Sequence, residues 1–147
     1  MAKPISSQFN VIWANLDPNA HMRHTAYNDY AAQVRVKMFD EFGFSLHNIM
    51  KLGYGPVLFQ ENTTFIKEVR INDTITVDSA AFALRRDKKI WKLRHQIFDG
   101  KGDLACKIEV VGAFLDLTTR KVVTPTEDII VMLNQLPTTE DFEWFDK

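Results

Sequence analysis

Cysteine is almost absent from this 147-residue sequence, in which Cys106 is the only one. An internal disulfide is therefore excluded, and we expect the reducing environment of the cytoplasm. Positive charge is not in surplus either, because 18 basic residues face 19 acidic ones and leave a net charge of −1. This balance gives no reason to expect nucleic acid or an anionic membrane surface as a partner.

Long hydrophobic runs are missing as well. No segment is apolar over the length that a bilayer requires, and the N-terminus lacks the apolar core and cleavage site of a signal peptide. The sequence has no repeat, low-complexity segment or linker, while hydrophobic residues make up 46% of it. We therefore expect a single globular domain over residues 1–147.

The clearest periodicity lies between residues 27 and 42, where apolar side chains recur at helical spacing. Gly43 follows the last periodic position, where helices commonly end. The pattern predicts a long helix whose apolar face is wide enough to be wrapped by a large surface. The apolar positions are Tyr27, Tyr30, Ala31, Val34, Met38 and Phe42.

Most of the remaining sequence is typical of strands. Alternation through Phe9, Val11 and Trp13 predicts a short strand before the helix. Further helices are expected at 45–52 and from Thr124, as a cap, to about Gln135. The sequence leaves open whether the tail from 141 docks on the body or on a partner chain. Four long strands are expected in hairpin succession at 56–69, 74–84, 90–98 and 104–117.

This order of elements predicts an α+β fold, in which an antiparallel sheet carries one buried helix across its face. The long strands have apolar residues on both alternations in places. One face can cover the helix while an edge or second face meets another subunit, so we expect an oligomer. These apolar residues include Phe59, Phe65, Phe82 and Leu84.

The stretch NLDPNAHMRHTAY, residues 15–27, joins the first strand to the helix. Its order, a strand with an aromatic end, an Asp-Pro turn and a tyrosine-bearing helix before a long sheet, resembles the hotdog fold. More narrowly, it is similar to the hydroxybenzoyl-CoA thioesterase-like branch of the acyl-CoA thioesterases. The matching residues are Trp13, Asp17, Pro18, His21, Tyr27 and Tyr30.

The resemblance implies a sheet wrapped around a central helix, an acyl-CoA substrate, no metal or organic cofactor, and a homodimer or homotetramer. It assigns Asp17 as the catalytic carboxylate, either nucleophile or general base on water. Backbone amides near Met22, Arg23 and His24 would hold the thioester carbonyl. Such amides at a helix N-terminus are unpaired and carry the positive end of the helix dipole, which suits a developing oxyanion.

Other residues are candidates for substrate binding. His21 would orient the loop or meet the substrate, and Tyr27 is a core residue with a polar tip. Glu61, in the middle of a strand, is a rival carboxylate or a solvent-facing residue. Arg85 and Arg86, at a strand end, would receive the CoA phosphates or belong to a solvated turn.

Three departures from the family pattern alter the surroundings of Asp17. Asn15 stands where many members have an acidic residue, Ala20 replaces a frequent glycine, and Arg23-His24 replaces an Asn-Asn pair. Two alternatives therefore stay open, an enoyl-CoA hydratase and a non-catalytic acyl-binding protein. A metal site is not expected, because His21 and His24 have no third histidine nearby.

Overall fold

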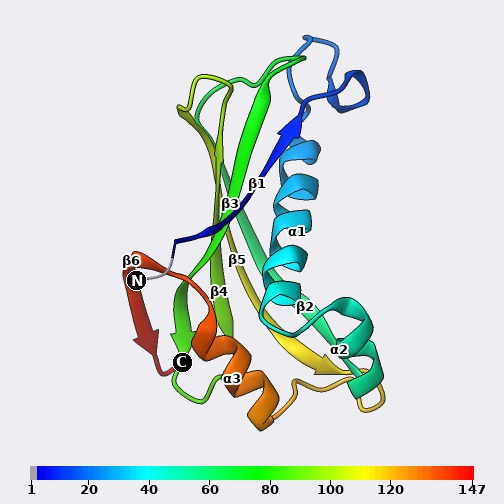
Figure 1. The fold of residues 1–147 in the computed structure, drawn as a ribbon, viewed down its shortest axis with the longest axis vertical. Coiled ribbons are helices and arrows are strands. Elements are labelled where there is room, and N and C mark those ends of the chain that lie inside the picture. The colour runs from blue at the N-terminus through cyan, green and yellow to red at the C-terminus, as the bar shows by residue number, and fades with distance from the viewer. Residues whose placement is uncertain (1–2) are drawn as a thin grey trace.

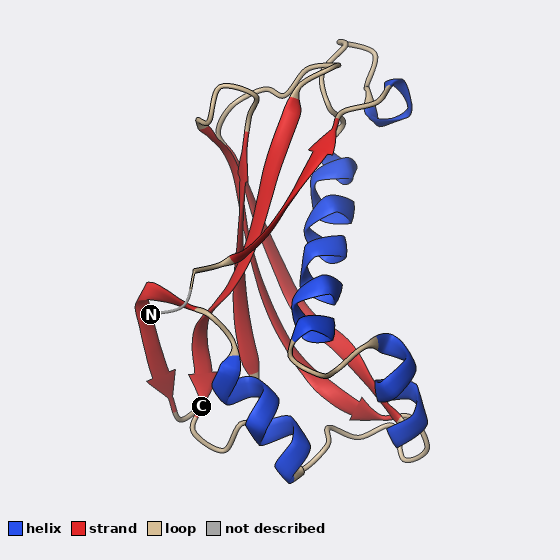
Figure 2. Cartoon of the chain, in the orientation of Figure 1, coloured by secondary structure: helices blue, strands red, loops and turns tan. Residues whose placement is uncertain are grey.

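The computed structural model describes residues 3–147 and contains one long helix lying along one face of a six-stranded sheet (Figure 1). Figure 2 shows the helices of residues 46–52 and 127–135 at one end of the molecule, away from the start of the long helix, and the short 3-10 turn of residues 13–15 at the other end. The elements are β1 (Ile5–Asn10), the short 3-10 helix η1 (Trp13–Asn15), α1 (His24–Glu41), α2 (Leu46–Leu52), β2 (Tyr54–Phe65), β3 (Thr74–Arg85), β4 (Trp91–Phe98), β5 (Leu104–Asp116), α3 (Glu127–Gln135) and β6 (Thr138–Phe145).

The strands follow the order β1-β3-β4-β5-β2, and every pair along this path is antiparallel. β6 runs parallel to β3 and occupies its second half, Ala81–Arg85, whereas β1 pairs with the first half. This is the α+β hotdog arrangement, so the predicted fold class is confirmed. The expected hairpin succession is wrong at one point, because β2 pairs with β5 at the far side of the sheet.

The core lies between α1 and the sheet. Phe39 packs against Trp91 and Phe114, with ring centroids 5.5 and 5.7 Å apart, and Tyr30 packs against Phe9 at 4.8 Å. The predicted apolar face of the helix is confirmed, and Gly43 ends the helix in a left-handed conformation, with φ 97°. The buried residues of α1 are Ala26, Tyr27, Tyr30, Ala31, Val34, Met38 and Phe39. None of the helices within residues 3–147 is long and apolar enough to cross a membrane.

Three predicted boundaries are wrong. β2 ends at Phe65 rather than at residue 69. β1 ends at Asn10, and Trp13 lies in η1 with 80% of its surface exposed, because Ile12 donates to the side chain of Asn15 and the chain leaves the sheet. α3 begins only after Thr126, which makes no side-chain cap. Backbone pairing of Val123 with Phe114 keeps the preceding segment beside β5.

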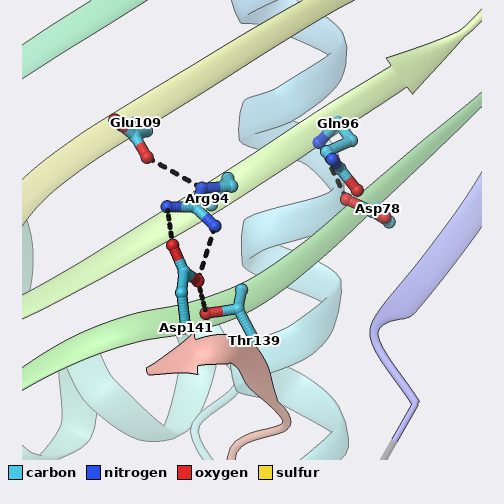
Figure 3. A network of polar contacts seen from close by, with 6 residues as sticks. All are labelled: Asp78, Arg94, Gln96, Glu109, Thr139 and Asp141. Carbon is cyan, nitrogen blue, oxygen red and sulfur yellow. Dashed lines mark hydrogen bonds and ion pairs between the residues drawn. The ribbon is translucent and has the colours of Figure 1, made fainter. Parts of the chain in front are cut away.

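The C-terminal tail docks on the body of the same chain as β6. Arg94 of β4 donates two hydrogen bonds to Asp141, at 2.8 and 2.9 Å, and one to Glu109 of β5, at 2.7 Å (Figure 3). The hydrogen bonds from Arg94 hold the pKa of Asp141 well below its usual range. One arginine thus ties three strands together on the face opposite α1.

A gap interrupts the ladder between β3 and β4. Regular pairing stops between Val77 and Ala80, and the carboxylate of Asp78 accepts the backbone N–H of Gln96 at 2.7 Å (Figure 3). The backbone carbonyl of Asp78 instead contacts His95, whose Nδ1 lies 3.0 Å from the carbonyl oxygen. His95 is buried, and this contact satisfies its Nδ1.

The two groups at this gap titrate in opposite senses. Burial lowers the pKa of His95 to about 3, so on acidification the unfolded chain takes up this proton first and stability is lost below pH 6.5. Burial raises the pKa of Asp78 to about 6, so the folded chain takes up that proton first and stability is gained as the pH falls from 6 to 3.8.

We therefore predict that Asp78→Asn removes the stability gained on acidification through Asp78 and leaves the stability lost through His95. The stability of the variant relative to the wild type should fall by up to about 3 kcal/mol between pH 7 and pH 4, measured by urea unfolding. Asp141→Asn is the control. The lowered pKa of Asp141 stabilises the wild type at neutral pH, and acid removes that contribution, so the stability of this variant relative to the wild type should rise as the pH falls. Parallel pH curves for Asp78→Asn and the wild type would contradict this account.

Candidate active site

The loop between β1 and α1 is fastened on both sides. Within the loop, Leu16 bridges to Met22, and the N–H of Asp17 donates to the carbonyl of His21 at 2.8 Å. The segment that follows β2 holds the loop from outside, since the N–H of Met22 donates to the carbonyl of Val69 at 2.7 Å. The loop is therefore a fixed platform in front of the helix.

One of the two carboxylate oxygens of Asp17 accepts hydrogen bonds from the backbone of this loop. Oδ1 accepts the backbone N–H groups of Asn19 and His21, at 2.9 and 3.2 Å, which is the usual work of an aspartate before a turn. Within residues 3–147, no side chain or backbone group donates to Oδ2. The carboxylate is thus oriented through Oδ1, and Oδ2 is available to solvent or a ligand.

A surface pocket of about 320 Å³ opens beside this carboxylate. It lies at the end of the sheet where β2 finishes and α1 begins, at the top of Figure 1. Its wall combines the loop, the first turns of the helix and the segment after β2. The lining residues are Asp17, His21, Met22, His24, Tyr27, Phe65, Ile66, Lys67 and Glu68.

The backbone amides at the start of α1 are not equally available. The N–H of Met22 is used by Val69, and that of Arg23 donates to the carbonyl of Asn15 at 2.7 Å. In the part of the chain that the structure describes, the N–H groups of His24 and Thr25 have no acceptor, as expected for the first helical turn. The predicted role of the Arg23 amide is therefore corrected, because its hydrogen is already engaged.

The side chain of Arg23 also has a local role. Its guanidinium donates to the carbonyl of Ala14 and to the hydroxyl of Thr25, the latter at 3.0 Å. These bonds tie η1 to the first turn of α1. Arg23 thus helps to fix the loop against the helix.

His21 and Tyr27 both reach the pocket, as the sequence predicts. Nε2 of His21 lies 3.1 Å from the carboxylate of Glu68, so the imidazole is tethered across the pocket mouth. Tyr27 packs edge-on against Phe65 at 5.2 Å, and burial raises its pKa to about 12. Its phenol is therefore neutral at physiological pH.

The structure places Arg85 and Arg86 away from this site. β3 starts at Thr74, opposite Asn10 and next to the loop, and runs for 12 residues to the other end of the sheet. Arg85 pairs there with Asp87 at 2.8 Å and Arg86 with Asp146 at 3.1 Å. These contacts fit the solvated turn that the sequence left open as an alternative, and the binding of CoA phosphates by Arg85 and Arg86 stays a prediction.

The residues that line the pocket differ from the sequence candidates at β2 and in the segment after it. Glu61 is exposed on β2 and does not line the pocket. Lys67 and Glu68 do line it, and neither was a candidate from the sequence. The pairing of β2 with β5 brings them there, and no local pattern signals that pairing. Within residues 3–147, no three His, Cys, Asp or Glu side chains converge to hold a metal ion.

Ala20 occupies the position where a glycine is frequent in the family, and its backbone is left-handed, with φ 63°. A side chain in this region costs about 1–2 kcal/mol, because Cβ crowds the neighbouring carbonyl oxygen. The loop accepts this strain, and its hydrogen bonds hold the turn despite the substitution.

Ala20→Gly should therefore stabilise the protein by about 0.5–1 kcal/mol, the relieved strain less the extra entropy of glycine in the unfolded chain. The measurement is the midpoint of urea unfolding. Ala32→Gly, the same change inside α1, is the control and should destabilise by about 1 kcal/mol. A loss of stability in Ala20→Gly equal to that in the control would show that the loop is not strained.

Solved structures with the same fold are numerous. A hypothetical protein from Staphylococcus aureus, solved in complex with CoA, is 23% identical, with a TM-score of 0.83 over 90% of this chain and 82% of that one. DHNA-CoA thioesterase from Staphylococcus aureus is 18% identical, with a TM-score of 0.74 over 81% and 78%. A 1,4-dihydroxy-2-naphthoyl-CoA thioesterase from Synechocystis is 12% identical, with a TM-score of 0.79 over 90% and 97%.

A search of curated protein sequences gives no significant match. A sequence model of the thioesterase-like superfamily matches residues 11–133, which include the loop, the central helix and the long strands. The prediction of a hotdog-fold thioester hydrolase is confirmed at the level of the family. The chain belongs to the thioesterase-like superfamily.

Proposed function

We propose that the protein is an acyl-CoA thioesterase, which hydrolyses an acyl-CoA to the free acid and CoA. The observation that carries this proposal is that one pocket is lined both by Asp17, whose Oδ2 is uncommitted, and by His24, whose unpaired amide begins α1 next to that of Thr25. CoA bound to a Staphylococcus aureus protein of the same fold supports the choice of substrate.

The chemistry follows from this arrangement. The carbonyl oxygen of the thioester would accept the N–H groups of His24 and Thr25, which stabilise the negative charge that develops when the carbonyl carbon is attacked. Asp17 would either attack that carbon itself or remove a proton from the attacking water. The carbon–sulfur bond then breaks, and the CoA thiolate takes up the proton that Asp17 removed from water, or a proton from solvent if Asp17 attacks directly. In the second case water hydrolyses the acyl–aspartyl anhydride, which releases the free acid and restores Asp17. Both roles of Asp17 stay open.

The other pocket residues bind rather than react. The tethered imidazole of His21 borders the mouth of the pocket, and the neutral phenol of Tyr27 lies beside the ring of Phe65. An acyl group entering between α1 and β2 would first meet the rings of Tyr27 and Phe65. Cys106 takes no part in the reaction, because burial raises the pKa of its thiol to about 12.

The assembly that we propose is a homodimer joined through β2, working in the cytoplasm as one domain per chain. Within residues 3–147, the outer edge of β2 has no partner strand. An open edge with exposed apolar side chains favours pairing with a second copy. Such pairing would place the pocket at the subunit interface, since the pocket includes the end of β2. The exposed apolar residues are Leu58, Phe59, Phe65 and Ile66.

The chemical proposal is tested by release of CoA, followed by thiol titration, from a panel of aliphatic and aromatic acyl-CoAs. Asp17→Asn keeps an Oδ1 acceptor for the turn but removes the reactive carboxylate, so kcat should fall by about a hundredfold or more. Asp40→Asn, on an exposed position of α1, is the matched control and should keep wild-type kcat.

Full turnover by Asp17→Asn would show that another group performs the attack. Failure of the wild type to release CoA from any substrate would contradict the thioesterase proposal itself. Binding of acyl-CoA without turnover would then indicate a ligand-binding protein, and hydration of crotonyl-CoA would indicate a hydratase.

The dimer is tested by light scattering, which should give twice the chain mass of 17.0 kDa for the wild type. Phe59→Glu puts a charge on the exposed edge of β2 and should yield the monomer mass. Val131→Glu, an equally exposed apolar position on α3, should leave the dimer intact. A dimer that survives Phe59→Glu and separates with Val131→Glu would place the interface on α3 instead.

A further inference from the structure

Asn15, at the end of η1, is hydrogen-bonded to the central helix at two points. Its backbone carbonyl accepts the N–H of Arg23 at 2.7 Å, and its side-chain oxygen Oδ1 accepts the hydroxyl of Tyr30. Arg23 lies directly before the first residue of α1, and Tyr30 lies seven residues later, about 10 Å further along the helix axis. Two attachments at different points of one helix restrict both the position and the orientation of Asn15.

The orientation of the Asn15 amide follows from a third contact. The backbone N–H of Ile12 lies 3.3 Å from Oδ1. A backbone N–H can only donate, so the atom that it faces must be the amide oxygen rather than the amide nitrogen. Burial raises the pKa of Tyr30, so its hydroxyl keeps its proton at neutral pH and donates to the same oxygen. Oδ1 therefore joins η1 to the second turn of α1.

Tyr30 connects this contact to the core. Its side chain is buried, with 8% of its surface exposed, and its ring packs against Phe9 of β1, with centroids 4.8 Å apart. Side chains of a helix lean toward its N-terminus, which brings the hydroxyl from the second turn back toward the loop. The position of Asn15 is therefore set by the packing of α1 on the sheet, and not by the loop alone.

The two attachments lie between the groups to which we assign the chemistry. Asp17 follows Asn15 by two residues. On the helix, the N–H groups of His24 and Thr25 directly follow that of Arg23, which the carbonyl of Asn15 accepts. The carboxylate and the free amides are thus linked through one hydrogen-bonded residue. A shift of about 1 Å between such groups can slow a reaction about a hundredfold.

We propose that Asn15 and Tyr30 are positioning residues, which together hold the carboxylate of Asp17 in front of the free amides at the start of α1. The lining of the pocket, as residues 3–147 form it, includes neither of them, so they act without touching the substrate. This inference rests on the proposed thioesterase function and adds the pair that aligns its two parts. The pair sets the rate of the chemical step and not the affinity for acyl-CoA.

The test measures kcat and KM for the acyl-CoA that the wild type hydrolyses best. Tyr30→Phe keeps the ring against Phe9 and removes the hydroxyl, so kcat should fall by about tenfold or more while KM changes by less than about twofold. Ser7→Ala is the matched control, because it removes a hydroxyl that accepts from Lys37 further along the same helix. Both constants of the control should equal those of the wild type.

Variants of Asn15 give an independent reading should Tyr30→Phe fold poorly. Asn15→Ala removes the acceptor and should slow kcat to the same extent, whereas Asn15→Asp keeps an oxygen for both donors and should stay within about threefold of the wild type. The double variant Tyr30→Phe/Asn15→Ala should be no slower than Asn15→Ala alone, because both changes break the same hydrogen bond. A contact that served only stability would leave kcat unchanged in all of these variants when folded.

Wild-type kcat in folded Tyr30→Phe and Asn15→Ala would overturn the positioning proposal while leaving the thioesterase intact. A rise in KM at unchanged kcat would overturn it too, because the pair would then bind the substrate. A wild type that releases CoA from no acyl-CoA would overturn the thioesterase proposal instead.

Discussion

The burial of α1 against the sheet is the constraint on which the rest of the structure depends. Seven side chains of this helix are removed from water, and β1, β3, β4 and β5 all contact it. That packing fixes where the helix begins, and so where its unpaired amides point. The loop before it is clamped between η1 and the segment after β2, which leaves Asp17 in front of those amides. A rigid core thus supplies the precision that a thioester carbonyl requires.

The helix is not apolar throughout, and two of its polar residues have hydrogen-bond partners in the sheet. Asn28 and Arg35 are half-buried, and each has a partner in the sheet, Thr63 and His95 respectively. The partner of Arg35 is itself anchored through a gap in the β3–β4 ladder. These hydrogen bonds satisfy polar groups that the helix brings against the sheet.

The periodicity of the sequence predicts the features of the fold that neighbouring residues determine, namely the helices and the long strands. The central helix, the helix that ends at Gly53 and the long strands follow from spacing and turn residues, because these are local properties. The site loop was predictable for the same reason, since Asp17, His21 and Tyr27 lie within one short stretch. Long-range pairing was not predictable. β2 crosses to β5, the tail forms β6, and Glu68 joins the site from a distant segment. Composition also gives no strand direction, so it did not show that Arg85 and Arg86 lie at the opposite end of β3 from the loop.

The most direct measurement is a crystal structure with an acyl-CoA analogue in which a methylene replaces the thioester sulfur, so that the carbonyl is kept but cannot be hydrolysed. The account predicts that the carbonyl oxygen lies about 3 Å from the amide nitrogens of His24 and Thr25, with the carboxylate of Asp17 facing the carbonyl carbon. A carbonyl bound away from the start of α1, or on the far side of the loop from Asp17, would contradict it.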